Sequence, residues 1–340
     1  MNTFKNFYIK HKLNTPSADR NLLSDILNEA GKPKVKLTPE IDWYIRGHLQ
    51  AAQEKLERGE GLTEGDLAFM EKARGMVKAE RLRQVELPAQ YGKRLETLKT
   101  FEFIKNVENP VIIGIDGKEY FAPTLEQIMA KITPEKAALV EKYIEKPMLL
   151  LVPFAMPLKT IAEKAGSKKG KLGQDPVYTG NYDVDSDLPE RGERQEQLVY
   201  FPEKYDKTDH GGLTKAEVLN SETRNTFPGW QVLIVDGTET VPKNTLGKSA
   251  IGLKRESDAL GLSGLTPEDW LALHAEGSLR GNPFRDYTKH SGTWNLASYL
   301  EKDGRVPHAC WSRDDSRAYL FMDGAGNSRA DLDARRAVRL

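Results

Sequence analysis

The stretch that decides the fold class is residues 306–320, which read VPHACWSRDDSRAYL. Its two ends are apolar and aromatic and predict short strands over 308–311 and 317–322, joined by a polar turn. Residues 230–235 predict another strand, because β-branched and aromatic side chains dominate them. Short strands or strand edges are also expected over 294–300 and 337–340, so this part of the chain is predicted to be mixed and rich in loops.

The N-terminal part has the periodicity of helices instead. Ser17 precedes an apolar stripe over 22–27, which predicts a helix. Thr38 precedes a proline and a glutamate, the order expected where a helix begins. Thr63 is followed by Asp66 three residues later, which is typical of a helix cap. We therefore predict an α+β fold, with a helical N-terminal region followed by a mixed, loop-rich C-terminal domain.

Composition divides the chain into four predicted parts. The helical region covers 1–107 and a mixed α/β region covers 108–165, where an Asp-Gly pair at 116–117 predicts a β-hairpin. Residues 166–197 are polar and lack apolar periodicity, which predicts a flexible linker or a functional loop. The C-terminal mixed α+β domain covers 198–340. A chain of 340 residues also has room for about two domains.

Charge and cysteine content exclude several classes of protein. The 50 Lys and Arg balance the 50 Asp and Glu, so the whole chain has no basic footprint for nucleic acid or an anionic membrane. No apolar stretch approaches the length of a membrane span, and the first residues contain no secretory signal. The single cysteine, Cys310, excludes a disulfide framework and a multi-cysteine zinc site. These features predict a cytoplasmic protein without membrane insertion.

Two motifs resemble known ligand loops but lack necessary residues. Residues 166–171, GSKKGK, have only three residues between the glycines, and Leu172 replaces the hydroxyl that a phosphate loop needs. Three alternating aspartates over 183–187 match the start of a calcium loop. However, Leu188 stands where that loop needs glycine, and Arg194 stands where it needs a bidentate glutamate. We predict no cofactor and no bound metal.

Histidine and cysteine could support an enzyme of unknown class. His308 and Cys310 are two residues apart, so both side chains are expected on one face of a strand, where they could act as base and nucleophile. His210 precedes two glycines and could present its imidazole in an open turn. A cysteine next to a tryptophan is more often a small buried hydrophobe, so no catalytic residue is assigned.

The polar surface around 312–333 favours recognition instead. Asp, Asn, Ser, Arg, Tyr and Gly dominate it, and such side chains provide adaptable hydrogen bonds. Two tryptophans among Gly, Asn, Asp and Arg could be core anchors or ligand platforms. The predicted ligand-binding residues are Trp294, Trp311, Arg313, Asp315, Arg317 and Tyr319.

The C-terminal segment also resembles a known ending. Residues 306–320 and the stretch ARRAVRL at 334–340 are similar to the close of an uncharacterised bacterial protein family that is frequent in candidate phyla. The ending also resembles C-type-lectin-like domains of the formylglycine-generating-enzyme type, and some variable proteins use that fold as a ligand-binding scaffold. Ala334 and Arg336 replace a glycine and a proline of the pattern, and the copper-binding cysteine pair of those enzymes has no counterpart. The resemblance therefore implies a fold rather than a reaction.

Three functions remain open at this point. The leading one is non-enzymatic recognition of a protein or small ligand by the C-terminal domain. The first alternative is an enzyme that uses histidine or cysteine of that domain. The second is association with nucleic acid through the basic N-terminal helices, because residues 1–105 hold 19 Lys and Arg against 15 Asp and Glu. Those charges do not form one long basic face, so nucleic acid is not the expected partner.

Overall fold

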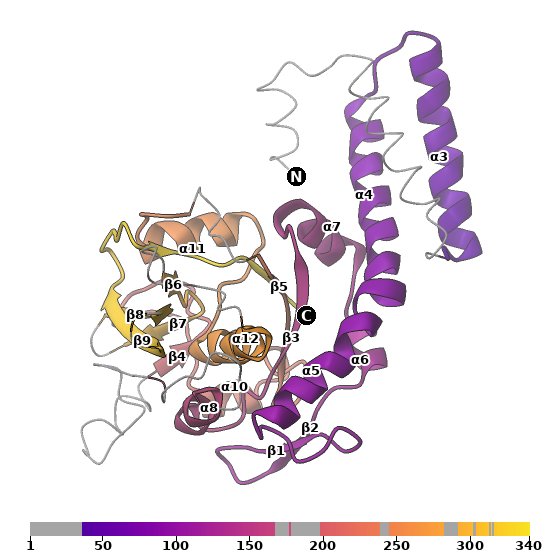
Figure 1. Ribbon diagram of the computed structural model, residues 1–340. Helices are drawn as coiled ribbons and strands as arrows, with labels where there is room; N and C mark the ends of the chain where they lie inside the picture. The colour runs from indigo at the N-terminus through magenta and orange to yellow at the C-terminus, as the bar shows by residue number, and fades with distance from the viewer. Residues whose placement is uncertain are drawn as a thin grey trace. The chain divides into compact units, whose positions relative to one another are not determined.

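The computed structural model describes residues 36–166, 177, 198–238, 245–281, 292–301, 304–312, 314 and 316–340 (Figure 1). The protein has the predicted α+β fold. Its chain divides into two compact units, which are Met1–Ala89 with Met129–Lys142, and Gln90–Ile128 with Tyr143–Leu340. We call them the helical unit and the mixed unit. The four predicted parts of the chain stay a prediction, and the stripe over 22–27 and most of 166–197 lie outside the described residues.

The helical unit is built on two helices that begin where their capping residues predict. Helix α3 covers Pro39–Glu57, and the Thr38 hydroxyl accepts a hydrogen bond from the Ile41 amide. Helix α4 covers Glu64–Arg81, and Thr63 forms a capping box with Asp66. Both predicted helix starts are confirmed, because a side-chain oxygen satisfies an amide that has no partner within the helix.

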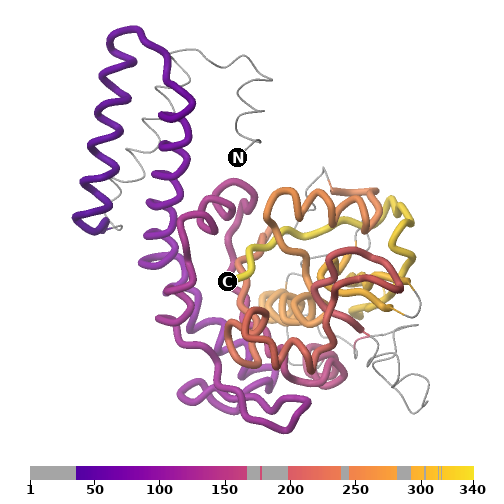
Figure 2. Tube along the Cα trace, turned by 180° about the vertical axis from the view of Figure 1, so that it is seen from behind, coloured from indigo at the N-terminus to yellow at the C-terminus, as the bar shows by residue number. Residues whose placement is uncertain are grey.

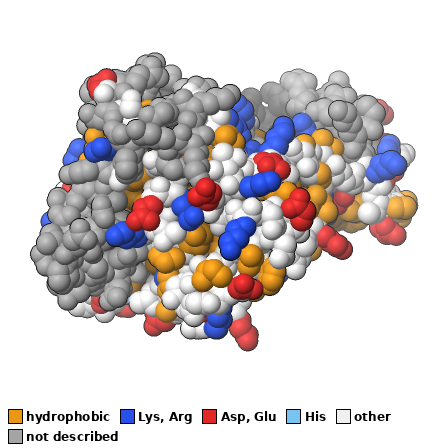
Figure 3. Space-filling view, turned by 60° about the horizontal axis from the view of Figure 1, so that its bottom comes forward, with side chains coloured by type: hydrophobic (Ala, Val, Ile, Leu, Met, Phe, Trp, Pro, Cys, Tyr) orange, Lys and Arg blue, Asp and Glu red, His pale blue; other side chains and the backbone are white. Residues whose placement is uncertain are grey.

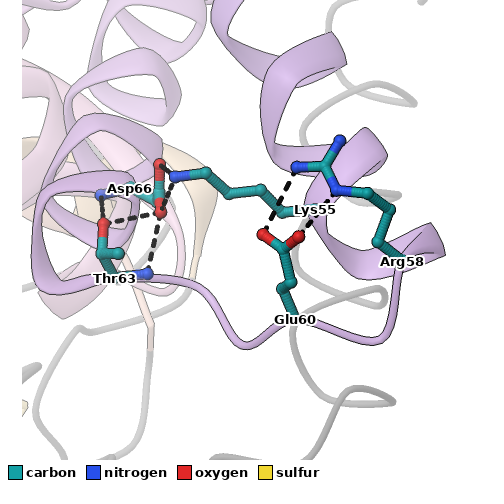
Figure 4. Close-up of polar contacts among 5 residues, drawn as sticks. All are labelled: Lys55, Arg58, Glu60, Thr63 and Asp66. Carbon is teal, nitrogen blue, oxygen red and sulfur yellow. Dashed lines mark hydrogen bonds and ion pairs between the residues drawn. The ribbon is translucent and has the colours of Figure 1, made fainter.

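The connection between α3 and α4 is held by charged side chains (Figure 4). Lys55 Nζ lies 2.8 Å from a carboxylate oxygen of Asp66, which also accepts from the Thr63 amide at 2.8 Å. Beside them, Arg58 Nε donates to Glu60 Oε1 at 2.7 Å. The cap of α4 is therefore joined to the last turn of α3.

The apolar stripes of α3 and α4 pack against each other. The core of the pair consists of Ile45, Leu49, Leu56, Met70, Ala73 and Val77. Helix α7, Pro134–Tyr143, approaches α4 closely at Gly75, where a Cβ atom would lie 2.6 Å from the Pro134 carbonyl oxygen. Only glycine permits this approach.

Helix α4 continues into a π-helix, η1, over Leu82–Glu86, and then into helix α5, Pro88–Thr100. Pro88 is the first residue of α5, where proline is tolerated because the amide that it lacks would have no partner within the helix. Helix α6 covers Leu125–Ala130.

The mixed unit contains a buried antiparallel sheet of three strands from distant parts of the chain. They are β3 (Pro147–Val152), β5 (Gln231–Asp236) and β11 (Ala337–Arg339), in the order β11-β5-β3. Figure 2 shows the C-terminal strand returning to the interior of this unit. The predicted strands at 230–235 and 337–340 are confirmed, and residues from three separated segments share one core.

Helix α12, Pro267–Arg280, is buried on every side from Pro267 to Ser278. It contacts β3 and helix α8 (Leu158–Ala165), and it also contacts strand β8 of the second sheet. Its first turn carries two fully buried acids, Glu268 and Asp269. Burying a charge is costly unless it has partners, and both acids have them.

Glu268 Oε1 accepts a hydrogen bond from the Tyr200 hydroxyl at 2.6 Å and lies 2.8 Å from Lys215 Nζ. Asp269 Oδ2 lies 2.7 Å from a guanidinium nitrogen of Arg339 in β11. Asp269 also closes a capping box with Thr266. The start of α12 is therefore connected to β4, α10 and β11 by charged or hydrogen-bonded contacts.

The second sheet has six strands in the order β10-β6-β8-β7-β4, with β9 paired to β8. Their bounds are β4 Leu198–Tyr200, β6 Gly292–Trp294, β7 Ser298–Leu300, β8 Arg305–Ser312, β9 Arg317–Gly324 and β10 Leu332–Asp333. Strands β8 and β9 form the hairpin that the sequence predicts, with Ser312 opposite Arg317 and His308 opposite Phe321.

The predicted hairpin at Asp116-Gly117 is also confirmed. Strands β1 (Val111–Ile113) and β2 (Glu119–Phe121) pair antiparallel, and Gly117 has a positive φ of 75°. Among the described residues, this unit also contains the helices α10 (Lys215–Asn220) and α11 (Ala250–Ala259). Among the helices within the described ranges, none is both long and apolar enough to cross a bilayer.

Candidate functional site

The two predicted tryptophan platforms lie inside the mixed unit. Trp294 is fully buried and belongs to a core cluster with Leu332 and Tyr299. Trp311 is also buried, and its ring stacks on His274 of α12 with centroids 5.5 Å apart. Neither ring faces solvent, so the core interpretation describes both tryptophans.

Of the four predicted polar ligand-binding residues, two can be placed. Arg313 and Asp315 lie outside the described residues. Arg317 and Tyr319 alternate along β9 and lie on its half-buried side, whereas Ala318 between them is buried. Their alternation follows from the two-residue period of a strand, as expected, although the side they share is half-buried rather than fully exposed.

The same side of β9 carries two residues that the sequence analysis missed. Phe321 and Asp323 continue the alternation and are half-buried as well. The period-two pattern that selected Arg317 and Tyr319 would have found them if it had been extended to the end of the strand. We call Arg317, Tyr319, Phe321 and Asp323 the β9 face.

Aromatic rings form a continuous row on this side of the sheet. Tyr319 and Phe321 stack with centroids 5.2 Å apart and an interplanar angle of 16°. Phe321 lies 5.7 Å from the His308 ring on β8, and His308 lies 5.4 Å from Trp294 on β6. The row therefore runs from the core outwards to the half-exposed Tyr319.

A charged network stands at the C-terminal end of β9. Arg329 donates to Asp323 at 3.0 Å and to both carboxylate oxygens of Asp331 at 3.1 Å. Asn327 Nδ2 donates to Asp323 Oδ1 at 2.6 Å. Burial alone would raise the pKa of Asp323, but the hydrogen bonds from Asn327, the Gly324 amide and Arg329 keep it below its usual value. Asp323 is therefore a fixed, ionised acceptor.

His308 and Cys310 lie on one strand as predicted, but their environment does not activate them. Burial raises the pKa of the Cys310 thiol to about 12 and lowers the pKa of His308 to about 4. A cysteine nucleophile needs a lowered pKa, because the thiolate is the reactive form. His210 is engaged elsewhere, since its Nδ1 accepts from the Gly212 amide at 2.9 Å and its ring neighbours Tyr299.

The basic residues of the helical unit that the structure describes are mostly paired with acids. Arg74 and Lys78 contact Glu141, while Arg81 contacts Glu86 at 3.0 Å. On the face seen in Figure 3, Lys and Arg side chains are interspersed with Asp and Glu, and hydrophobic side chains show between them. Paired cations offer little net charge to phosphates, which weakens the nucleic-acid alternative.

The chain matches no known protein family, and comparisons with curated proteins and with solved structures also find no match. Residues 167–171 and 183–187, which belong to the two ligand-loop motifs of the sequence, lie outside the described residues. The case for a function therefore rests on the β9 face and its surroundings.

Proposed function

We propose that the mixed unit recognises a protein or small ligand through the β9 face, without catalysing a reaction. The observation that carries this proposal is the stacked pair of Tyr319 and Phe321, half-exposed between charges of both signs. Arg317 stands at one end of the strand, and Asp323 stands at the other.

Stacked rings suit recognition because they offer a large apolar surface and lose little conformational freedom on binding. The opposite side of β9 is anchored by the buried residues Ala318, Leu320 and Met322. The hydrogen bonds of Arg329 hold Asp323 in place before any ligand arrives. A surface fixed in this way avoids part of the ordering cost of binding.

Two finer statements belong to the same proposal. We propose that the C-terminal region is C-type-lectin-like, in keeping with the resemblance of residues 306–320 and 334–340. The location in the cytoplasm, which rests on the single cysteine of the chain, also stays a prediction.

Arrays of immobilised glycans and peptides test the proposal directly. The wild-type chain should retain at least one ligand class that the double variant Arg317→Ala, Tyr319→Ser loses by about tenfold or more, a usual loss when central contacts are removed. The matched control is Arg255→Ala, since Arg255 is exposed on α11 and should not affect binding. If the double variant binds as the wild type does, or unfolds by circular dichroism, the β9 face is not the recognition surface.

The enzyme alternative makes a different prediction for Cys310. An activated cysteine would react with a thiol reagent in the native protein near neutral pH, whereas the buried thiol should react only after unfolding. Fast native labelling would favour the enzyme and contradict the packing interpretation.

A further inference from the structure

The helical unit has an exposed tryptophan, Trp43, in the wall of an open hollow. Trp43 of α3 is 78% exposed, the largest fraction among the exposed large hydrophobic residues of the described chain. Trp43 forms part of the wall of an open hollow of about 720 Å³, whose other apolar lining comes from Pro39, Ile41, Tyr44 and Met76. We call this surface the Trp43 patch.

The patch does not belong to the core of the α3–α4 pair. That core uses the stripe of α3 that contains Ile45 and Leu49, whereas Trp43 points away from it. Ile41 and Met76 are only partly buried against the core, so part of their surface faces the hollow. An exposed tryptophan beside an apolar hollow is a feature of association surfaces.

One acid and one base complete the patch. Glu40 and Lys72 also line the hollow, and both are exposed. Lys72 lies over the Tyr44 ring at 5.6 Å from its centroid. In the part of the chain that the structure describes, neither side chain has an ion-pair partner, whereas most other cations of these helices do.

We propose that the Trp43 patch binds the same patch of a second copy of this chain, forming a two-fold symmetric dimer. A two-fold interface requires one surface to be complementary to itself. This surface has an exposed indole in the wall of an open hollow, so the indole of each copy can enter the hollow of the other. Its single acid and single base allow Glu40 of one copy to meet Lys72 of the other, twice in each dimer.

Sedimentation velocity of the full chain over a concentration series tests the dimer. The wild-type chain should pass from monomer to dimer as its concentration rises. Trp43→Ala should raise the dissociation constant by at least about tenfold, because a central tryptophan often carries much of the binding energy. Circular dichroism should be unchanged, since the side chain is exposed. The matched control is Ile113→Ala, which removes an exposed apolar residue of β1 and should leave the dimer intact.

Charge reversal separates this geometry from other modes of association. Glu40→Lys places two lysines against each other across the two-fold axis, and Lys72→Glu does the same with two acids, so each should weaken the dimer. The double variant Glu40→Lys, Lys72→Glu should restore it, because the pair is only inverted.

A chain that stays monomeric at every concentration overturns the proposal. A dimer whose dissociation constant is unchanged in Trp43→Ala also overturns it, and so does a dimer that the double reversal does not restore. A monomer whose Trp43 fluorescence is that of a buried indole would show that another part of the same chain covers the patch, which also overturns it.

Discussion

Helices α4 and α12 begin with the same signature, a threonine followed three residues later by an aspartate, yet the two caps lie in opposite surroundings. The Thr63–Asp66 box lies at the surface, with Lys55 as its cation. The Thr266–Asp269 box is fully buried, with Arg339 as its cation. The local motif fixes where each helix begins, but the surroundings decide what losing the carboxylate would cost.

Removing the buried carboxylate should have the largest effect. Asp269→Ala removes a fully buried carboxylate and leaves the Arg339 guanidinium, whose side chain is 20% exposed, without its counter-charge. Breaking a fully buried pair in this way costs about 3–5 kcal/mol, which is the upper limit expected for this variant. Tryptophan fluorescence in denaturant measures this loss, because four of the five tryptophans belong to the mixed unit. A loss as small as that of Asp66→Ala would show that burial does not distinguish the two caps.

Acid should destabilise the surroundings of α12 before it affects the cap of α4. Burial lowers the pKa of His274 to about 4, so the folded state holds the neutral imidazole. The stability that this provides is complete above about pH 6.5 and is lost as the pH falls towards 4, by on the order of 3 kcal/mol. His308 contributes in the same window, since burial also lowers its pKa to about 4.

Asp66 should respond in a lower pH range. Burial opposes its ionisation, but hydrogen bonds from Lys55 and Thr63 bring its pKa below the usual 3.8. Its stabilising contribution is therefore complete above that value and is lost only as the pH falls further. Denaturant unfolding at several pH values between 7 and 3 checks both pH ranges. In His274→Gln the free energy of unfolding should fall less steeply between pH 6.5 and 4 than in the wild type. If the dependence of the unfolding free energy on pH is unchanged in that variant, His274 does not cause the loss of stability in the upper range.

Two glycines of α4 should give a smaller contrast. Gly75→Ala forces a Cβ atom against the Pro134 carbonyl and should cost about 1–3 kcal/mol, the usual range for overpacking. Gly65→Ala lies in the first turn, where its Cβ would meet only the Thr63 hydroxyl at an ordinary 3.7 Å. It should stabilise the helix slightly, because alanine favours helix more than glycine does. Thermal unfolding followed by circular dichroism measures both, and equal effects would rule out the close approach of α7.

The surface cap should give the smallest effects. Asp66→Ala should cost about 1 kcal/mol, as the loss of a capping side chain usually does. Arg58→Ala removes the neighbouring exposed pair with Glu60 and should not change the unfolding midpoint, because solvent screens exposed ion pairs. A larger loss from Arg58→Ala than from Asp66→Ala would reverse the expected order of these contacts.

Local sequence signals predicted much of the fold. The starts at Thr38 and Thr63, the strand at 230–235 and the turn at Asp116-Gly117 depend on neighbouring residues alone, so the sequence could reveal them. The order β11-β5-β3 could not be predicted, because it joins three segments that no local pattern connects.

The candidate site was predicted only in part, for a similar reason. Trp294 and Trp311 are flanked by polar residues, which left both a core anchor and a ligand platform open. In the structure β8 directs Trp311 towards α12 and pairs His308 with Trp294. Glu268 and Asp269 are acids in the first turn of α12. Their burial depends on Lys215 and Arg339, which lie far away in the chain.

The three-stranded sheet also has a consequence for how quickly the protein folds. Strands β3, β5 and β11 begin at residues 147, 231 and 337, so their pairing must close very long loops. The α3–α4 pair needs only a short turn. Topologies dominated by distant contacts fold more slowly, so the helical pair should form early. The apolar strand Met148–Val152 should stay unpaired until β5 reaches it. During that interval the strand is exposed to other chains, and the newly made protein is then most prone to aggregate.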